Sequence, residues 1–464
     1  MKNLTHTIAA ISTPPGKGGV AIIRLSGDMA FEIADRVFFP VSGKRFSECR
    51  GRMQVYGYVM DGESVVDDCL ATRFPSPNSY TGEDTVEIGC HGGRLVSAMV
   101  LETLLKAGAI PAGPGEFTRR AFVNGRLSLT EAEAISDLLE ATTREQVKLS
   151  AGKARTALAD RIASIRERAV GLMSSMYARI DYPDEDLGDF TDDEILHILY
   201  NIMKDISSLL RTYDTGRSIA EGIKTAICGK PNVGKSSLYN LLVGEEAAIV
   251  TDIEGTTRDV LERSISLGKV KLLLADTAGI RDGEKADTVE RIGIEKSYKM
   301  AEKCELMFAI FDISRPFDED DRLVVDMMSR SDAMKIIIFN KSDKATDFDT
   351  EAIARLGDVS ITVSLTDSAE TCLNEISEIV NQRFTDGSIK IGEDAVITSA
   401  RQYAALHRAE EFIDYAYSAL EMGISQDAIS SDVERAIGAL SELDGRCVSE
   451  EIVSDIFSKF CVGK

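Results

Sequence analysis

The stretch Lys224–Leu242, KTAICGKPNVGKSSLYNLL, decides the fold of this chain. It opens with a short apolar run, Thr225–Cys228, that suits a buried parallel strand. The run leads into GKPNVGKS, a complete GxxxxGK[ST] match that starts at Gly229, and then into an apolar-periodic helix. Glycines let the main chain wrap closely around phosphate oxygens, and a helix N-terminus points its positive end at them. The stretch therefore predicts a phosphate-binding loop in an α/β domain.

Two side chains of this loop carry its chemistry. Lys235 would bridge the outer phosphates as a point charge, and the Ser236 hydroxyl would take one magnesium position. The nucleotide-binding residues predicted from the loop are consecutive in the chain: Asn232, Val233, Gly234, Lys235, Ser236 and Ser237.

Two further loops follow in the order that a GTPase requires. TDIEGTTRD, which begins at Thr251, is rich in hydroxyls, and its Thr257 would complete the magnesium shell. DTAG begins at Asp276 after a hairpin predicted around Gly268. Its Asp would reach magnesium through water, and its Gly amide would bond the outer phosphate. The predicted nucleotide contacts in these loops are Thr251, Thr256, Thr257, Asp276, Thr277, Ala278 and Gly279.

The base selector is NKSD, which follows the buried strand predicted over Lys335–Phe339. The Asp343 carboxylate would accept hydrogen bonds from the ring N–H and the exocyclic amine of guanine, and adenine offers no such pair. A later segment, Ser364-Leu365-Thr366, would back the base. The predicted base contacts are thus Asn340, Lys341, Asp343, Ser364 and Leu365, and the ligand is GTP with magnesium.

The residue that orients the attacking water is not decided by local sequence. Ras-type enzymes place a glutamine directly after DxxG, whereas this chain has Ile280, which neither donates nor accepts a hydrogen bond. The nearby candidates are Glu284, Glu290 and Glu295, with Arg281 as the nearest cation. Local chemistry leaves the choice among them open.

Length and charge set the outer limits. With 464 residues, and ~150 residues per domain, about three domains are expected. The net charge of -23 argues against broad non-specific binding of nucleic acid. The eight cysteines form no CxxC pair and are expected to be mostly buried thiols in a reducing compartment. No apolar run approaches ~20 residues and no leader is visible, so we expect a soluble, cytoplasmic protein without membrane contact.

The pattern changes along the chain predict an insertion. Strand-like runs and a helix over 94–107 indicate an α/β domain, 1–122, and the predicted strands are 7–12, 20–25, 54–60, 68–74 and 85–89. Helical periodicity then covers 128–215 and 399–464, around the block with the nucleotide motifs. The helical features predicted are a capping box at Ser128–Glu131, a long helix through the stripe Leu158, Ile162, Ile165, Ala169, Leu172, Met176 and Ile180, and helices over 192–214, 399–422, 428–443 and 449–460.

We therefore expect an α/β multidomain chain of three parts. These are an N-terminal α+β domain (1–122), a helical bundle domain (123–218 with 388–464), and an inserted P-loop G domain (219–387) with a mixed, mostly parallel sheet.

The motifs together resemble one family closely. GKPNVGKSS, TDIEGTTRD, DTAGIRD…TVERIGIEK, TPPGKGGVAIIRLSG near the start and the terminal CVGK resemble the MnmE (TrmE) family of tRNA-modification GTPases over the whole chain. The resemblance implies that the N-terminal domain binds tetrahydrofolate and mediates homodimerisation. It also implies a heterotetramer with the flavoprotein MnmG, in which only the partner holds FAD. Together such proteins form a 5-aminomethyl or 5-carboxymethylaminomethyl group on the wobble uridine of tRNA.

The resemblance also assigns residues. It implies magnesium ligands at Ser236 and Thr257, a potassium cage at Asn232, Thr251, Ile253 and Thr256, and Glu290 as the acid that orients water. Potassium would play the part of an arginine finger when two G domains meet. A tetrahydrofolate derivative, in the 5,10-methylene or 5-formyl form, would meet Arg24, Glu87, Arg126 and Lys464. The Arg126 position is often lysine in the family, although either cation suits the glutamate tail of the cofactor.

Some alternatives stay open beside this interpretation. Arg24 and Glu87 are also consistent with a buried ion pair at the end of a strand, and His91 in GCHGG with a turn histidine rather than an acid–base. Cys461 and Lys464 would dock as a tail near the folate. Two rival functions are an Era-type ribosome-assembly switch and a folate one-carbon transferase with a regulatory G domain. Stimulation of GTP hydrolysis by potassium but not sodium would separate them from the MnmE interpretation.

Overall fold

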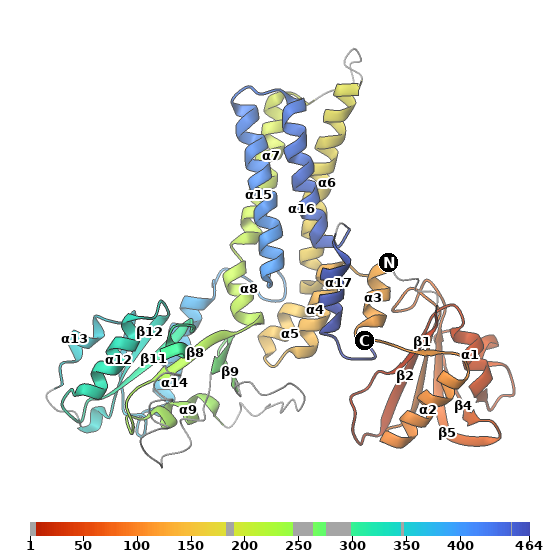
Figure 1. The fold of residues 1–464 in the computed structure, drawn as a ribbon, viewed down its shortest axis with the longest axis horizontal. Coiled ribbons are helices and arrows are strands. Elements are labelled where there is room, and N and C mark those ends of the chain that lie inside the picture. The colour runs from red at the N-terminus through yellow and green to blue at the C-terminus, as the bar shows by residue number, and fades with distance from the viewer. Residues whose placement is uncertain (1–5, 182–189, 245–262, 275–297, 345–347, 447) are drawn as a thin grey trace. The chain divides into compact units, whose positions relative to one another are not determined.

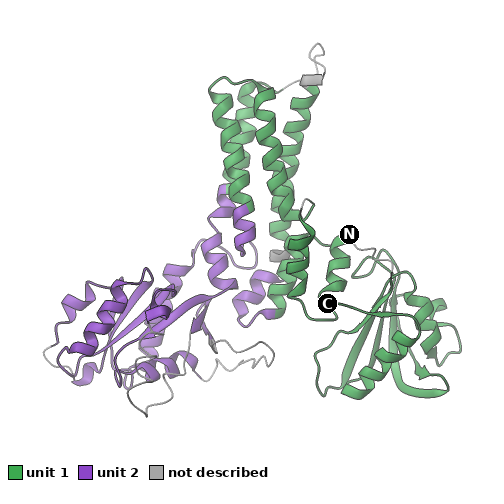
Figure 2. Cartoon of the chain, in the orientation of Figure 1, with its two compact units in different colours: residues 1–139, 155–206, 405–464 green, residues 140–154, 207–404 purple. Residues whose placement is uncertain are grey.

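The computed structural model describes residues 6–181, 190–244, 263–274, 298–344, 348–446 and 448–464. These residues form two compact units, coloured separately in Figure 2. Unit 1 comprises residues 1–139, 155–206 and 405–464, and unit 2 comprises 140–154 and 207–404. Among the described residues, no helix is both long enough and apolar enough to span a bilayer.

Unit 1 begins with a seven-stranded sheet in the order β3-β4-β5-β6-β2-β1-β7. The pairing is antiparallel except between β1 and β7. The buried residues of α1 and α2 share one core with the inner face of this sheet, as alternation along its strands requires. The elements are β1 (Ile8–Ile11), β2 (Val20–Ser26), α1 (Ala30–Val37), β3 (Phe38–Pro40), η1 (Phe46–Glu48), β4 (Gln54–Asp61), β5 (Ser64–Phe74), β6 (Thr85–His91), α2 (Arg94–Lys106), β7 (Ile110–Pro111) and α3 (Glu116–Val123).

The helices of unit 1 that follow are α4 (Leu129–Glu140), α6 (Gly152–Asp181), α7 (Asp192–Leu210), α15 (Ala400–Glu421), α16 (Gln426–Asp444) and α17 (Glu450–Ser458). α6, α7, α15 and α16 lie side by side (Figure 1). Every member of the predicted α6 stripe whose side chain the structure describes is buried, from Leu158 to Met176. Ion pairs connect the helices, such as the largely buried pair of Arg166 and Asp444 at 3.3 Å. The predicted capping box is also present, because Ser128 N donates to Glu131 Oε2 and Glu131 N donates to Ser128 Oγ.

Unit 2 is built on a six-stranded sheet in the order β13-β12-β11-β8-β10-β9, with only β9 and β10 antiparallel. The predicted mixed, mostly parallel sheet is therefore confirmed. α9, α14, α8 and α5 share a core with one face, and α12 and α13 share a core with the other. The elements are α5 (Arg144–Ser150), α8 (Tyr213–Ala220), β8 (Ile223–Cys228), α9 (Lys235–Val243), β9 (Arg263–Leu267), β10 (Val270–Leu274), β11 (Leu306–Asp312), α12 (Glu319–Ser329), β12 (Met334–Asn340), η2 (Ser342–Lys344), α13 (Thr350–Ala354), β13 (Val359–Thr362) and α14 (Ala369–Phe384).

The helix predicted over 192–214 was wrong in one respect. α7 ends at Leu210 and a second helix, α8, begins at Tyr213. Thr212 lies at the break, where its hydroxyl donates to Leu209 O and accepts from the amide of Ile397. A long-range partner thus ends a helix that the local periodicity would continue.

Candidate GTP-binding site

The phosphate-binding loop runs from the end of β8 to the start of α9, as the sequence predicted. Gly234 takes φ +113°, and a Cβ there would lie 2.3 Å from Nδ2 of Asn340. A Cβ at Gly229 would lie 2.8 Å from the carbonyl oxygen of Ile310. Asn232 also has a positive φ, +64°. Close backbone approach therefore requires both glycines of the motif, and the loop leads directly into a helix N-terminus.

Lys235 lies across the loop that it follows. Its Nζ donates to the carbonyl oxygens of Gly229 and Lys230, each at 2.8 Å. Burial lowers the pKa of the Lys235 ammonium from its usual value. Ser236 and Ser237 follow in the first turn of α9 and are exposed. The Lys235 ammonium and the two serine hydroxyls thus lie at the N-terminus of α9, where the helix dipole favours a bound anion.

Asn340 connects three segments that are distant in sequence. Its side-chain amide donates to the carbonyl oxygen of Val233 at 2.7 Å, and its Oδ1 accepts from the backbone amide of Leu365 at 3.0 Å. Lys341 adds a second bridge, because its Nζ donates to Asn232 O at 3.1 Å and pairs with Asp312 Oδ2 at 2.6 Å. The phosphate loop, the NKSD segment and the Ser364-Leu365 segment therefore form one assembly.

The base-selecting residues lie at the edge of this assembly. Asp343 lies in the exposed turn η2, three residues after the buried Asn340. Ser364 is buried, and its hydroxyl contacts Thr366 Oγ1 at 3.0 Å and Asp367 Oδ2 at 3.2 Å. Ser342 N donates to Val363 O at 3.2 Å, which fixes η2 against the end of β13. An exposed carboxylate beside a hydrogen-bonded loop suits recognition of two N–H donors on one purine edge.

In unit 1 the structure brings Arg24 and Glu87 together. They lie directly opposite each other on β2 and β6, and Arg24 Nε and Nη2 approach Glu87 Oε1 at 2.9 and 2.8 Å. The rings of Tyr80 and Phe117 lie 5.3 and 5.6 Å from the Arg24 guanidinium carbon. The side chains are 16% and 29% exposed, so the ion pair remains accessible beside aromatic rings.

Arg126 lines a cavity of about 440 Å³ that does not include Arg24 or Glu87 in its lining. The cavity is largely polar, and its acidic residues are Asp28, Glu83 and Asp84. Lys464 ends the C-terminal tail, and its carbonyl oxygen accepts a hydrogen bond from the backbone amide of Phe117 at 3.1 Å. The structure therefore connects Lys464 to the Arg24–Glu87 pair through Phe117, whereas Arg126 lies in a separate hollow.

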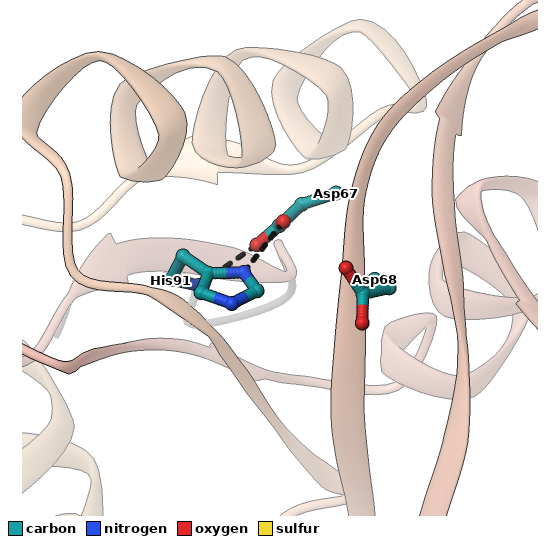
Figure 3. Close-up of side chains that lie close together, drawn as sticks. All are labelled: Asp67, Asp68 and His91. Carbon is teal, nitrogen blue, oxygen red and sulfur yellow. Dashed lines mark hydrogen bonds and ion pairs between the residues drawn. The ribbon is translucent and has the colours of Figure 1, made fainter.

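His91 was wrongly predicted as a turn residue, because it is the last residue of β6. Asp67 holds it from β5: the His91 ring Nδ1 and backbone N each lie 2.8 Å from an Asp67 oxygen (Figure 3). The hydrogen bond to Asp67 raises the pKa of His91, although its side chain is 64% exposed. Asp68 lies close by, so one atom from each of these three residues falls within a 4.8 Å group.

Comparison with known proteins identifies the family. The family model described as "GTP-binding protein TrmE N-terminus" matches residues 7–126, and "MnmE helical domain" matches residues 129–461. Curated proteins named tRNA modification GTPase MnmE are similar over 99% of this chain. The protein of Thermoanaerobacter sp. (strain X514) is 38% identical over 99% of its own length. Those of Clostridioides difficile (strain 630) and Bacillus subtilis (strain 168) are 36% and 37% identical over 100% of theirs.

The chain belongs to the MnmE family.

As a member of the MnmE family it is a GTPase, which agrees with the assembly around Lys235, Asn340 and Lys341. A crystal structure of Era in complex with MgGDPNP and nucleotides of 16S ribosomal RNA is similar at a TM-score of 0.28 and 23% identity, over 41% of this chain and 66% of that chain.

Several predicted site residues of this MnmE-family chain lie outside the described residues. They are Thr251, Ile253, Thr256, Thr257, Asp276, Thr277, Ala278, Gly279 and Glu290. The described part fits GTP and magnesium, because the glycine cradle, the Lys235 ammonium and the exposed Ser236 hydroxyl meet at the start of α9.

Sequence reasoning missed two residues of the assembly. Asp312, at the end of β11, fixes the Lys341 ammonium, and Lys230 pairs with two acids from α12. Asp312 and Lys230 each pair with residues that are distant in sequence, and no motif marks these pairs. Only the position of Asp312 at the carboxyl end of a buried strand, beside the loop after β8, gave a signal.

Proposed function

We propose that this MnmE-family GTPase is activated by potassium and works with the FAD protein MnmG. Together they would form the 5-aminomethyl or 5-carboxymethylaminomethyl group on the wobble uridine of tRNA. The observation that carries the proposal is similarity to tRNA modification GTPases over 99% of the chain, combined with an assembled phosphate and base site. Loss of this modification from tRNA, measured by nucleoside analysis of cells that lack the gene, tests it directly. Unchanged wobble uridine would reject it.

The described residues supply binding and orientation of GTP in this proposal. Lys235 places positive charge against the outer phosphates, and backbone N–H groups at the start of α9 donate hydrogen bonds to the phosphate oxygens. The Ser236 hydroxyl would hold magnesium together with Thr257, which lies outside the described residues, and the metal would neutralise negative charge on the phosphates. Asp343 accepts hydrogen bonds from the N–H groups of guanine, so a bound adenine would leave the carboxylate unpaired.

Hydrolysis would depend on residues from three places in the sequence. Asn232, which is exposed in the phosphate loop, would hold potassium with Thr251, Ile253 and Thr256, and Glu290 would orient the attacking water. A monovalent cation there adds positive charge where the transition state gains negative charge.

The cation test uses the full-length chain. We expect GTP turnover to be faster in potassium than in sodium at equal ionic strength. Asn232→Ala should remove the difference, and Glu290→Ala should lower turnover with GDP binding retained, because each removes a group that acts in the transition state. Equal rates in both salts would contradict the cation role, and unchanged turnover in Glu290→Ala would contradict the assignment of Glu290.

The N-terminal domain would bind a tetrahydrofolate derivative, in the 5,10-methylene or 5-formyl form. The accessible Arg24–Glu87 pair beside Tyr80 and Phe117 fits a flat, polar pterin, because a carboxylate accepts its N–H groups and aromatic rings contact its face. Lys464 would approach through the docked tail, and Arg126 would meet the glutamate end. Calorimetric titration with 5-formyltetrahydrofolate tests this: Glu87→Gln should weaken binding strongly. Equal affinity of the two proteins would reject the site.

The chain would act as a homodimer that joins MnmG in a heterotetramer with tRNA as substrate. The outer face of the N-terminal sheet supports the homodimer. On it Phe39 pairs with Tyr58, and Tyr56 pairs with Leu70. All four side chains are substantially exposed, and a patch of this kind favours burial against a second copy. Sedimentation should show a dimer that Leu70→Asp shifts toward monomer, and a monomeric parent protein would reject it.

The division into domains 1–122, 123–218 with 388–464, and 219–387 is part of the same proposal, as is a cytoplasmic location. Limited proteolysis and cell fractionation test the two statements separately.

A further inference from the structure

In the phosphate loop of this GTPase, the Lys235 ammonium donates hydrogen bonds to the carbonyl oxygens of Gly229 and Lys230. The position of that ammonium therefore depends on where the backbone of Lys230 lies. Any group that fixes Lys230 also fixes the charge that faces the phosphates.

The side chain of Lys230 is anchored outside the loop. Its ammonium lies 2.8 Å from Asp318 Oδ2 and 2.7 Å from Asp321 Oδ2, and the side chain is only 7% exposed. These two acids form a capping box at the start of α12. Asp318 Oδ1 accepts from the amides of Asp320 and Asp321, and Asp321 Oδ2 accepts from Asp318 N. Lys230 thus joins the phosphate loop to the end of a helix that packs on the sheet.

One ammonium faces two acidic side chains at this junction, and Asp321 is the more deeply buried of the two acids. Asp321 is 1% exposed, and among the described residues its Oδ1 has no hydrogen-bond partner. Burial raises the pKa of Asp321, and the hydrogen bond from Lys230 lowers the pKa of Asp318. Without the ammonium a carboxylate would be left buried and uncompensated, so the contact is strongly maintained.

We propose that Lys230 is a positioning residue for the binding of GTP and GDP. It acts by holding in place its own carbonyl group, which accepts a hydrogen bond from the Lys235 ammonium. It touches neither the base nor, by this geometry, the phosphates. Its loss should therefore weaken both nucleotides alike and leave turnover at saturating GTP nearly unchanged.

Three variants of the full-length chain separate this role from a purely structural one. Lys230→Met keeps the length of the side chain without its charge, and Lys230→Arg keeps the charge. The triple variant Lys230→Met, Asp318→Asn, Asp321→Asn removes the ammonium and both of its acidic partners together, and asparagine still caps a helix. Arg322→Met is the matched control, because Arg322 pairs with Glu319 at the same helix end but is exposed.

The readouts are Kd for a fluorescent GDP, KM and kcat for GTP, and the melting temperature. We expect Lys230→Met to raise Kd and KM about tenfold with kcat within about twofold, Lys230→Arg to restore them, and the control to change nothing. The triple variant should regain melting temperature but not affinity. Recovery of affinity together with melting temperature would overturn the proposal, since Lys230 would then act only as a counter-charge. Unchanged Kd in a folded Lys230→Met would overturn it as well.

Discussion

Asn340 is buried between two loops, and both of its side-chain hydrogen bonds go to main chain. Its Nδ2 satisfies Val233 O, and its Oδ1 satisfies the amide of Leu365. Asn340→Ala would leave a carbonyl and an amide unpaired in the interior, at a cost of roughly 2–4 kcal/mol. We expect a lower melting temperature for the nucleotide-binding domain by calorimetry and weaker GDP binding.

Asn240 offers the control for this substitution, since it is an exposed asparagine on α9 of the same domain. Asn240→Ala should change neither the melting temperature nor the affinity. If Asn340→Ala bound GDP and melted like the parent chain, the bridge between the loops would have no energetic role.

His91 predicts a pH dependence because Asp67 raises its pKa. A raised pKa means that the folded state binds the proton more tightly than the unfolded chain. The resulting stabilisation is complete below about 6.5, the usual histidine value, and is lost as pH rises through the folded value. In Asp67→Asn the His91 pKa, followed by NMR, should move down toward that usual value. The melting-temperature difference between the two proteins should shrink at higher pH, and a constant difference would contradict the linkage.

The hairpin of β9 and β10 is fastened to α14 at its turn. Asn381 Oδ1 accepts from the amide of Lys269 at 2.9 Å, and a Cβ at Gly268 would lie 2.0 Å from Asn381 Nδ2. Gly268 also has φ +60°. Gly268→Ala should therefore destabilise the domain by about 1–2 kcal/mol through backbone strain and the clash. In Gly268→Ala with Asn381→Ala the contact with Asn381 is absent and only Ser377 Oγ, 2.8 Å from the added Cβ, has to move. Calorimetry should therefore show less loss than the two single changes added together.

Among the helices and turns, those whose cause lies within a few residues were predictable from the sequence. The capping box of Ser128 and Glu131 and the hairpin turn at Gly268 are both confirmed. α1 was missed: it spans only Ala30–Val37, and its N-cap, Met29, makes no side-chain capping hydrogen bond. A short helix without a capping side chain gives a weak local signal, and its burial against the sheet decides it.

The residues of the candidate site also differ in whether their cause is local in the sequence. The loop residues Gly234 and Lys235 were predictable because a phosphate imposes local backbone geometry on any loop that binds it. The bonds of Asn340 to Val233 and of Lys230 to Asp321 join residues more than 90 positions apart. No periodicity records such pairs, so they follow only from the order of the strands.

Within unit 1, the C-terminal end of the chain completes the N-terminal domain. Gly115 N donates to Cys461 O at 3.4 Å, and Ser12 Oγ donates to Gly463 O at 2.9 Å. Gly463 has φ +98°, and a Cβ there would lie 2.4 Å from the carbonyl oxygen of Ile11. The tail therefore fits only with glycine at this position, as the predicted docking of Cys461 and Lys464 requires.

Gly463→Val should displace the tail from the N-terminal domain. Phe117 N would lose Lys464 O as its acceptor, so hydrogen exchange at the Phe117 amide should accelerate at least about tenfold if the lost bond is worth ~1.4 kcal/mol. Phe117 contacts the Arg24 guanidinium, so titration with 5-formyltetrahydrofolate should also weaken if the proposed folate site is right. Lys459→Ala is the control, because its ion pair with Asp455 is exposed and lies just before the tail. Unchanged exchange in Gly463→Val would show that the tail contributes nothing to the domain, whatever the outcome with folate.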